Sequence, residues 1–336
     1  MKTHCHTTAA LLLLTVSLPA HAQSPSGIVL VSYSGEHKVA LIDAATGKVE
    51  SLLTSGQGPH EITVSRDGAM AYVAISGVGP GGGEPGNSIA VIDIEQRATK
   101  DTFTLTDCRQ PHDTRLGRDG STLWVACGPA QAVLELDART GEVRRTLRTN
   151  LDGGWFVEVT PDERKLYVPH LEGQALSVID RKSGAARTIY SGSTQFGLAI
   201  SPDGREVWAS DSDQHKLIIV DTRSDQVGGS VTLGVPPQGQ FGFARLRFTA
   251  DGRSVAVVRG ASFLLVDARR RAVAWTVDLP HDGKVVAVSG DGRYAFVTHP
   301  GNDAFSVVDL AARKVLATHP TGKQPDGIAW VARPLR

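Results

Sequence analysis

The sequence repeats with a period of about forty-three residues, and this periodicity limits the folds that the chain can adopt. An apolar residue followed by aspartate recurs seven times, at Asp43, Asp93, Asp137, Asp180, Asp221, Asp267 and Asp309. The successive spacings are 50, 44, 43, 41, 46 and 42 residues. A second mark, a turn of the type RDG, PDG or GDG, ends at Gly68, Gly120, Glu163, Gly204, Gly252 and Gly292. Repeats of this length indicate an array of one supersecondary unit.

Each unit contains four short runs rich in Val, Ile, Tyr and Trp, which predict β-strands. One unit reads FGLAISPDG, REVWASDSD, HKLIIVDTRSD and QVGGSVTLG. The Asp and Gly of its first turn suit a tight hairpin, and the aspartate after the third run can close the next turn through its carboxylate. No segment has the period of a substantial helix. The pattern predicts an all-β chain of four-stranded antiparallel blades, because a β-sandwich would repeat less evenly and a β-helix repeat is shorter.

The sequence has six turn marks but seven repeat aspartates, and this difference indicates how the blades close into a ring. After its first two dozen residues the chain begins with a second-strand run, GIVLVSYSG, and it ends with a first-strand run, QPDGIAWVA. The last strand is therefore expected to complete the first blade, which removes exposed strand edges. We predict a seven-bladed β-propeller formed as a single domain by residues 23–336.

Residues 1–22 have the features of a secretory signal peptide. The apolar run AALLLLTVSL is followed by PAHAQ, which offers cleavage after Ala22. We therefore expect an exported, periplasmic, monomeric protein without a membrane span. Two cysteines then remain, Cys108 and Cys127. In an oxidising compartment they favour a disulfide, and the alternative is a pair of free thiols near a metal or substrate.

The charge balance argues against binding to nucleic acid. Lysine plus arginine and aspartate plus glutamate each number 35, so no net field attracts a polyanion. We expect instead a small-molecule ligand or a periplasmic protein as the partner. A haem cofactor has no support, because the chain contains no CxxCH motif.

The second-strand runs AYVAIS, LWVACG and LYVPHL each follow an xDG-type turn and precede an apolar-Asp strand. In this arrangement the chain resembles the YVTN-repeat family of seven-bladed propellers, which are bacterial periplasmic and surface proteins. The resemblance covers essentially the whole mature chain and implies the fold rather than an activity. The chain departs from the family at the last position of the repeat word, where Asn is replaced by Ile75, Cys127, His170, Asp211, Arg259 and His299.

The propeller topology gathers ionisable residues at one mouth of the central channel. The starts of the first strands and the ends of the second strands should surround this mouth. We expect a ligand-binding face made of His60, Glu61, His112, Asp113, Trp155, His170, Phe196, Asp211, Arg259, Lys284, His299 and Asp326. In the expected register, His60 and His112 pair with Ile75 and Cys127, and Tyr33 is a further aromatic at the rim. The opposite face, built from turns, suggests no site.

Three kinds of chemistry suit such a mouth. His60 and His112 could ligate a divalent metal. A histidine could also act as acid or base beside Arg259 or Lys284, as in a lactonase-like hydrolase or lyase. Aromatic side chains with a charged rim could instead bind a ligand without turnover, which is the function we favour. The alternatives for single residues are that the histidines cap loops and that the aromatics fill space between blades.

Two insertions interrupt the repeat. GVGPGGGEPGN at 77–87 is expected to form a flap over the mouth, because it lacks the Lys and Ser/Thr of a phosphate-binding loop. GVPPQGQFGFAR at 234–245 is a second candidate rim loop.

Overall fold

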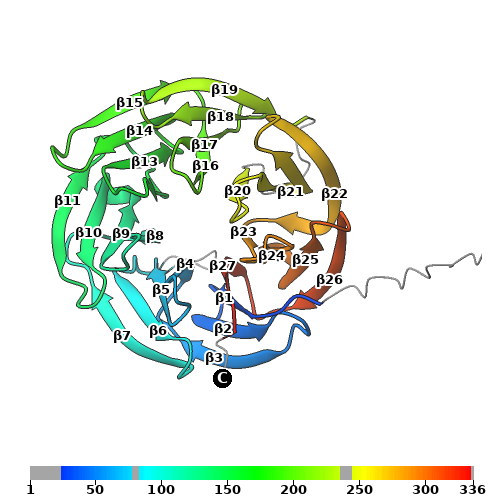
Figure 1. The fold of residues 1–336 in the computed structure, drawn as a ribbon. Helices are drawn as coiled ribbons and strands as arrows, with labels where there is room; N and C mark the ends of the chain where they lie inside the picture. Colours follow the sequence, from blue (N-terminus) through cyan, green and yellow to red (C-terminus); the bar gives the residue numbers. More distant parts are fainter. Residues whose placement is uncertain (1–23, 78–82, 235–243, 334–336) are drawn as a thin grey trace, which may run out of the picture.

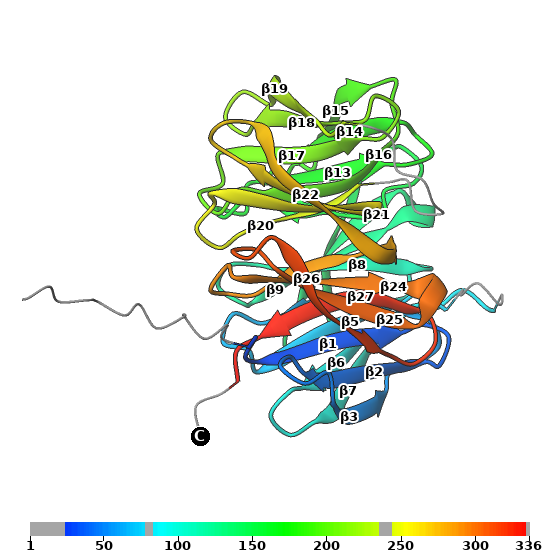
Figure 2. The same cartoon turned by 90° about the vertical axis from the view of Figure 1, so that its right-hand side faces the viewer.

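The computed structural model describes residues 24–77, 83–234 and 244–333. Within these ranges seven antiparallel sheets are arranged in a ring around a central channel (Figure 1). The side view shows a disc with the strands running from face to face (Figure 2). The seven-bladed prediction is confirmed. The expected signal peptide, residues 78–82 of the first insertion and residues 235–243 of the second lie outside the described residues.

The blades share one order of strands. The innermost strands are β27 (Pro325–Val331), β4 (Pro59–Val64), β8 (Pro111–Leu116), β12 (Glu158–Val159), β16 (Gln195–Ile200), β20 (Arg245–Phe248) and β23 (Val286–Val288). The second strands are β1 (Ile28–Tyr33), β5 (Met70–Ile75), β9 (Thr122–Cys127), β13 (Lys165–His170), β17 (Glu206–Asp211) and β24 (Tyr294–His299).

The third strands end in the repeated aspartates. They are β2 (Lys38–Asp43), β6 (Ser88–Asp93), β10 (Ala132–Asp137), β14 (Ala175–Asp180), β18 (Lys216–Asp221) and β25 (Ala304–Asp309). The outer strands are β3 (Val49–Thr54), β7 (Ala98–Thr104), β11 (Val143–Arg148), β15 (Ala186–Ser191), β19 (Gln226–Thr232), β22 (Ala272–Gly283) and β26 (Lys314–Pro320).

The sixth blade differs in one respect. Its β21 (Ser254–Asp267) spans both the second and the third run of the repeat. The first half of β21 pairs with β20, and its second half pairs with β22. Two short 3-10 turns, η1 (Gly128–Ala130) and η2 (Pro300–Asn302), follow β9 and β24. No helix in the described part of the chain is long and apolar enough to cross a membrane.

The turns form as the sequence predicts. The carboxylate of Asp221 accepts a hydrogen bond from the amide of Ser224 at 2.8 Å, and the other six repeat aspartates cap their turns in the same i to i+3 way. Gly204 has a φ of 72°, which only glycine adopts without strain. Local side-chain capping therefore sets the blade boundaries.

The chain closes its ring by pairing its two ends. β27 pairs antiparallel with β1, for example through Ile28 with Val331. This is the expected completion of the first blade.

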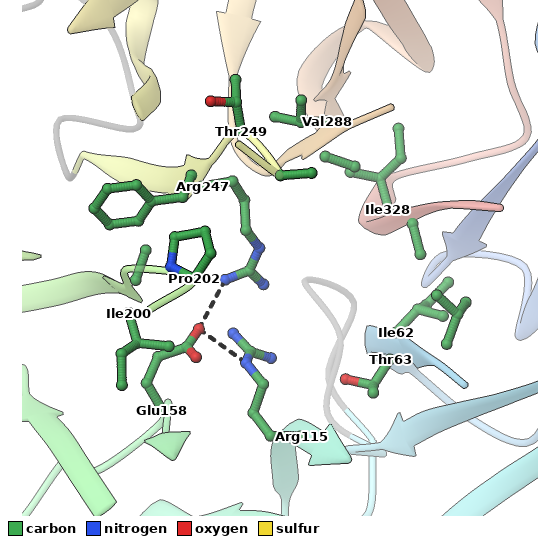
Figure 3. A pocket seen from close by; sticks show the side chains of 16 residues that line it. Ile62, Thr63, Arg115, Glu158, Ile200, Pro202, Arg247, Thr249, Val288 and Ile328 are labelled. Carbon is green, nitrogen blue, oxygen red and sulfur yellow. Dashed lines mark hydrogen bonds and ion pairs between the residues drawn. The ribbon is translucent and has the colours of Figure 1, made fainter. Parts of the chain in front are cut away.

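Side chains of the innermost strands point into the channel. Figure 3 shows Ile62, Arg115, Arg247 and Ile328 approaching the channel from different blades. The channel is therefore narrowed by side chains rather than by backbone.

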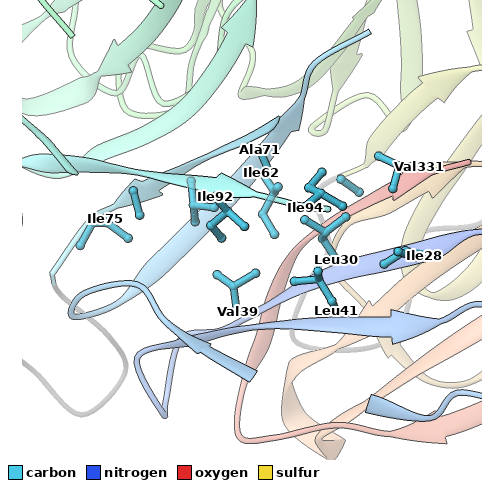
Figure 4. Packing of buried hydrophobic residues seen from close by; sticks show 13 residues of the cluster. Ile28, Leu30, Val39, Leu41, Ile62, Ala71, Ile75, Ile92, Ile94 and Val331 are labelled. Atoms are coloured by element: carbon cyan, nitrogen blue, oxygen red, sulfur yellow. The ribbon is translucent and has the colours of Figure 1, made fainter. Parts of the chain in front are cut away.

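The apolar core lies between the blades. One cluster joins Ile28, Leu30 and Leu41 of the first blade to Ile62 and Ile92 of the second (Figure 4). Burial of each such side chain contributes about 1.5–3 kcal/mol. Because these apolar clusters join neighbouring blades, ring closure completes the last of the interfaces between blades.

Candidate functional site

The candidate site residues lie at bulges near the starts of the innermost strands. In the second blade Pro59 pairs with Ile75 and Ile62 with Val73, so β4 holds one more residue than β5 between these pairs. The same extra residue occurs in β8, β16 and β27. A bulge re-aims side chains and disrupts strict alternation. The predicted pairing of His60 with Ile75 and of His112 with Cys127 is therefore wrong by one residue, because each second-strand end pairs with the preceding proline.

Bulged strands and the residues just before β12 and β23 bring together a cluster at one channel mouth, which we call the histidine mouth: His60, His112, Trp155, Lys284 and Asp326. The imidazole ring centroids of His60 and His112 are 4.3 Å apart. His112 also lies 5.4 Å from the ring of Trp155. Asp326 joins the cluster through Oδ2, which is 3.2 Å from Nδ1 of His60 and 2.7 Å from Nζ of Lys284. These residues come from five different blades.

Close approach of backbones makes this geometry possible. A Cβ added to Gly327 would lie 2.3 Å from the carbonyl oxygen of His60. Glycine after Asp326 therefore allows β27 to lie against β4 at the mouth. The contact between Asp326 and His60 depends on this packing.

The electrostatics leave both imidazoles neutral at neutral pH. Burial lowers the pKa of His60, although the carboxylate of Asp326 opposes this effect. Burial, with the neighbouring His60, lowers the pKa of His112 well below its ordinary value. Burial would raise the pKa of Asp326, but His60 and Lys284 outweigh it and the pKa is lowered. The mouth thus presents two neutral imidazoles beside an ionised carboxylate–ammonium pair.

Several buried polar atoms here have no hydrogen-bond partner among the described residues. They are Nδ1 of His60, Nδ1 of His112, Oδ1 of Asp326 and a guanidinium nitrogen, Nη1, of Arg245. Nδ1 of the neutral His60 lies 3.2 Å from Oδ2 of Asp326, but the two groups do not form a hydrogen bond. An unsatisfied buried polar atom costs about 1–3 kcal/mol, so a concentration of them points to a partner that arrives from outside the chain.

Below the mouth, the side chains of Glu61 and Arg245 meet across the channel, and we call this pair the septum. Nη2 of Arg245 in the sixth blade lies 2.8 Å from Oε1 of Glu61 in the second blade, and their side chains are only 6% and 3% exposed. The guanidinium of Arg245 also lies 3.8 Å from the ring centroid of Phe156. Phe156 in turn packs edge-on against Phe196. The septum therefore joins opposite blades and forms the floor of the histidine mouth.

Sequence reasoning missed Arg245 and Phe156. Phe156 directly follows Trp155, which was assigned to the mouth, and Arg245 directly follows Ala244, the position that aligns with Trp155 in the sixth blade. Glu61 and Asp113, which it included, occupy the same next position. The alignment of the repeats places Arg245 and Phe156 next to mouth positions, and this could have identified them. In a strand with strict alternation, however, adjacent side chains point to opposite faces, so these two would point away from the channel.

A second group of charged residues lies deeper in the channel. The guanidinium of Arg115 contacts Asp113 at 2.5 Å and Glu158 at 2.9 Å. Arg247 from the sixth blade contacts the same oxygen of Glu158 at 3.1 Å. Arg115, Glu158 and Arg247 line a cavity of about 400 Å³ that reaches turn residues Pro202 and Ala250. The turn face therefore holds a cavity that the sequence did not lead us to expect.

Four other predicted site residues are held by loop and strand contacts. Nδ1 of His170 lies 3.2 Å from the carbonyl of Asp152, and Nδ1 of His299 lies 3.1 Å from the carbonyl of Asp282. Asp211 accepts hydrogen bonds from Tyr190 and Ser193. Arg259 lies 2.7 Å from a ring nitrogen of His215. The contacts of His170 and His299 with backbone carbonyls match the alternative that these histidines cap loops.

The remaining sequence expectations can be placed as well. Tyr33 is buried within the core between the first and seventh blades, as expected of a space-filling aromatic. Cys108 and Cys127 form a disulfide with their Cα atoms 5.6 Å apart, so this prediction is confirmed. Cys127 pairs with Pro111, and the bridge therefore braces the strand that presents His112. In the described ranges no group of three or more His, Cys, Asp or Glu side chains is placed to share a metal ion.

Comparison with known proteins identifies the fold alone. No protein-family model matches the sequence, and no curated protein matches it. Solved structures do match. The periplasmic gluconolactonase PpgL of Pseudomonas aeruginosa is 19% identical with a TM-score of 0.72, covering 92% of this chain and 99% of that chain.

Two further structures are similar to the same degree. Hydrazine synthase of Kuenenia stuttgartiensis is 18% identical with a TM-score of 0.71, covering 89% of this chain and 99% of that chain. A functionally unknown protein from Desulfotomaculum acetoxidans is 12% identical with a TM-score of 0.74, covering 92% and 100%. Their different descriptions agree with a fold that supports many functions.

Proposed function

We propose that the histidine mouth binds a small polyhydroxylated ligand, such as a sugar or sugar lactone. The observation that carries this proposal is the concentration of unpartnered buried polar atoms from His60, His112, Asp326 and Arg245 beside aromatic rings. A ligand rich in hydroxyl groups can both donate to and accept from such atoms.

The balance of charge supports a neutral ligand. Asp326 is paired with Lys284, and Glu61 is paired with Arg245. The two imidazoles are neutral because burial lowers the pKa of both. Trp155 and Phe196 add flat apolar surfaces, and few polar groups among aromatics are typical of small-molecule sites.

Hydrolysis of a lactone is the second candidate function. The His60–Asp326 contact supplies a neutral imidazole beside a carboxylate, which suits a general base for water. The periplasmic gluconolactonase of similar fold acts, by its name, on a lactone. Lys284 lies in the same cluster and can stabilise a developing oxyanion.

The proposal also includes the setting of the protein. We infer that residues 1–22 are a signal peptide and that residues 23–336 form one propeller domain, monomeric and periplasmic, of the YVTN-repeat type. The disulfide supports export, because such bonds persist in oxidising compartments. His60 and His112 supply two imidazoles, and the proposal assigns no metal to them.

A binding titration tests the proposal. Methyl β-D-glucopyranoside and freshly dissolved glucono-1,5-lactone are added to the mature protein. Binding is measured by calorimetry, and the rate of lactone hydrolysis is measured separately. We expect saturable binding that is lost in the His60→Ala, His112→Ala double variant and kept in His319→Ala, a histidine on the outer strand β26. Absence of saturable binding by both probes, or equal binding by the double variant, refutes the proposal.

A further inference from the structure

The cavity at the turn-face end of the channel differs in chemistry from the histidine mouth. Its wall is mostly apolar, with Ile62, Val64, Ile200, Val288 and Ile328 among the lining residues (Figure 3). Arg115, Glu158 and Arg247 provide its charged groups. The septum formed by Glu61 and Arg245 lies between this cavity and the mouth.

The two arginines of the cavity share a single carboxylate oxygen. Oε1 of Glu158 accepts from Nε of Arg115 at 2.9 Å and from Nη1 of Arg247 at 3.1 Å. Arg115 has a second carboxylate partner in Asp113. Within the described part of the chain, Glu158 accepts the one hydrogen bond that Arg247 donates. Since a guanidinium carries five N–H donors, most donors of Arg247 remain for another acceptor.

The position of Arg247 makes these donors accessible. Its side chain is 28% exposed, and Figure 3 shows the guanidinium directed into the centre of the cavity. Burial and the neighbouring Arg115 lower the pKa of Arg247 to about 10, which reflects incomplete compensation of its positive charge. An apolar wall strengthens the attraction of such a cation for an anion.

We propose that this cavity binds a small organic carboxylate. The carboxylate would occupy the free donors of Arg247 and Arg115, since planar guanidinium groups match its two oxygens. The carbon skeleton would lie against the apolar wall. A volume of about 400 Å³ suits a compact ligand.

The aliphatic wall of the cavity favours an organic carboxylate over an inorganic oxyanion. Phosphate would satisfy the arginines but would leave the apolar surface in contact with water. The sequence contains the signal: Arg115, Glu158 and Arg247 each stand three positions after a residue assigned to the mouth register, namely His112, Trp155 and Ala244.

Ligand-observed NMR with three probes tests the inference on the mature protein. Benzoate and benzamide have nearly the same shape but differ in charge, and inorganic phosphate lacks a carbon skeleton. We expect benzoate to bind saturably, benzamide not to bind, and phosphate to compete only weakly. Binding of phosphate as tight as that of benzoate, or absence of benzoate binding, overturns the proposal.

Variants locate the site. Arg247→Gln should weaken benzoate binding by roughly tenfold or more, because a charged hydrogen bond is lost. Arg247→Lys keeps the positive charge but lacks the planar guanidinium group, so it should lose part of the affinity for benzoate. This variant also provides the test if Arg247→Gln does not fold. Arg271→Gln is the matched control, because Arg271 pairs with Glu206 at 2.8 Å on the periphery. Unchanged binding in both Arg247 variants refutes the assignment.

The test also separates this cavity from the mouth. The His60→Ala, His112→Ala double variant should bind benzoate as the unmodified protein does. Loss of benzoate binding in that variant would mean that the carboxylate binds at the histidine mouth, which would overturn the present inference. Failure of sugar binding at the mouth leaves this result unaffected.

Discussion

The septum across the channel provides the most direct test of the structure. We consider the substitution Glu61→Gln, which keeps the size of the side chain and removes its charge. Glu61 and Arg245 are 184 residues apart in sequence and 2.8 Å apart in space, with side chains 3% and 6% exposed. The substitution therefore leaves the guanidinium of Arg245 buried without a counter-charge.

The size of the expected loss of stability follows from the burial of this ion pair. At an effective dielectric constant of about 20, unit charges at the 2.8 Å separation attract by about 6 kcal/mol before the cost of desolvation. Removal of one partner of a buried pair typically costs about 3–5 kcal/mol, because the remaining charge is uncompensated. We expect Glu61→Gln to lower the free energy of unfolding by about 3 kcal/mol.

Equilibrium urea unfolding followed by tryptophan fluorescence measures the loss. The matched control is Glu206→Gln, whose partner Arg271 is also at 2.8 Å but whose pair is 29% and 40% exposed. Exposed pairs contribute about 0–1 kcal/mol, so the control should change little. A double variant, Glu61→Leu with Arg245→Met, should be more stable than Glu61→Gln, since no buried charge is left unpaired.

Two results would refute the reasoning about the septum. One is a loss below about 1 kcal/mol in Glu61→Gln, equal to that of the control. The other is a double variant whose loss equals the sum of the losses measured for Glu61→Leu and Arg245→Met singly, since coupled residues should not be additive.

Three further predictions concern pH, the disulfide and metal. Burial lowers the pKa of His170 and His299 to about 4. Because the unfolded chain then binds protons more readily, their stabilisation of up to about 3 kcal/mol each is complete above about pH 6.5 and is lost as the pH falls toward 4. Urea midpoints between pH 7 and 4 should fall less in His299→Gln than in the unmodified protein, and parallel curves would contradict this. Cys108→Ser with Cys127→Ser should cost about 3 kcal/mol, measured by the same unfolding assay against the oxidised protein, and an unchanged midpoint would argue against a stabilising bridge. Chelator treatment should leave sugar binding unchanged in calorimetry, whereas a loss restored by zinc would show that His60 and His112 hold a metal.

The seven-bladed fold could be predicted because its signals are local. The repeat aspartates and turn glycines cap hairpins within a few residues, as Asp221 with Ser224 illustrates. Alternating apolar runs then specify strands. Even ring closure followed from the strand types at the two ends, because β27 is a first strand without a following second strand and β1 is a second strand without a preceding first strand.

The candidate site could be predicted only in part. The common register placed His60, His112, Trp155, Lys284 and Asp326 at one mouth, and in the structure these side chains lie close together. It also included His170 and His299, which bond to loop carbonyls. Sequence spacing cannot separate these cases, because both kinds of histidine end or begin a strand at the same height.

The amino-acid sequence by itself determined the blade, the number of blades and the mouth of the channel near which His60 and His112 lie, since these depend on turn chemistry and strand alternation. Only the tertiary structure decided which side chains meet across the channel. The Glu61–Arg245 septum and the shared carboxylate of Glu158 join blades that are distant in sequence. Such contacts depend on the radius of the ring and on bulges that re-aim single residues, and neither leaves a local pattern in the chain.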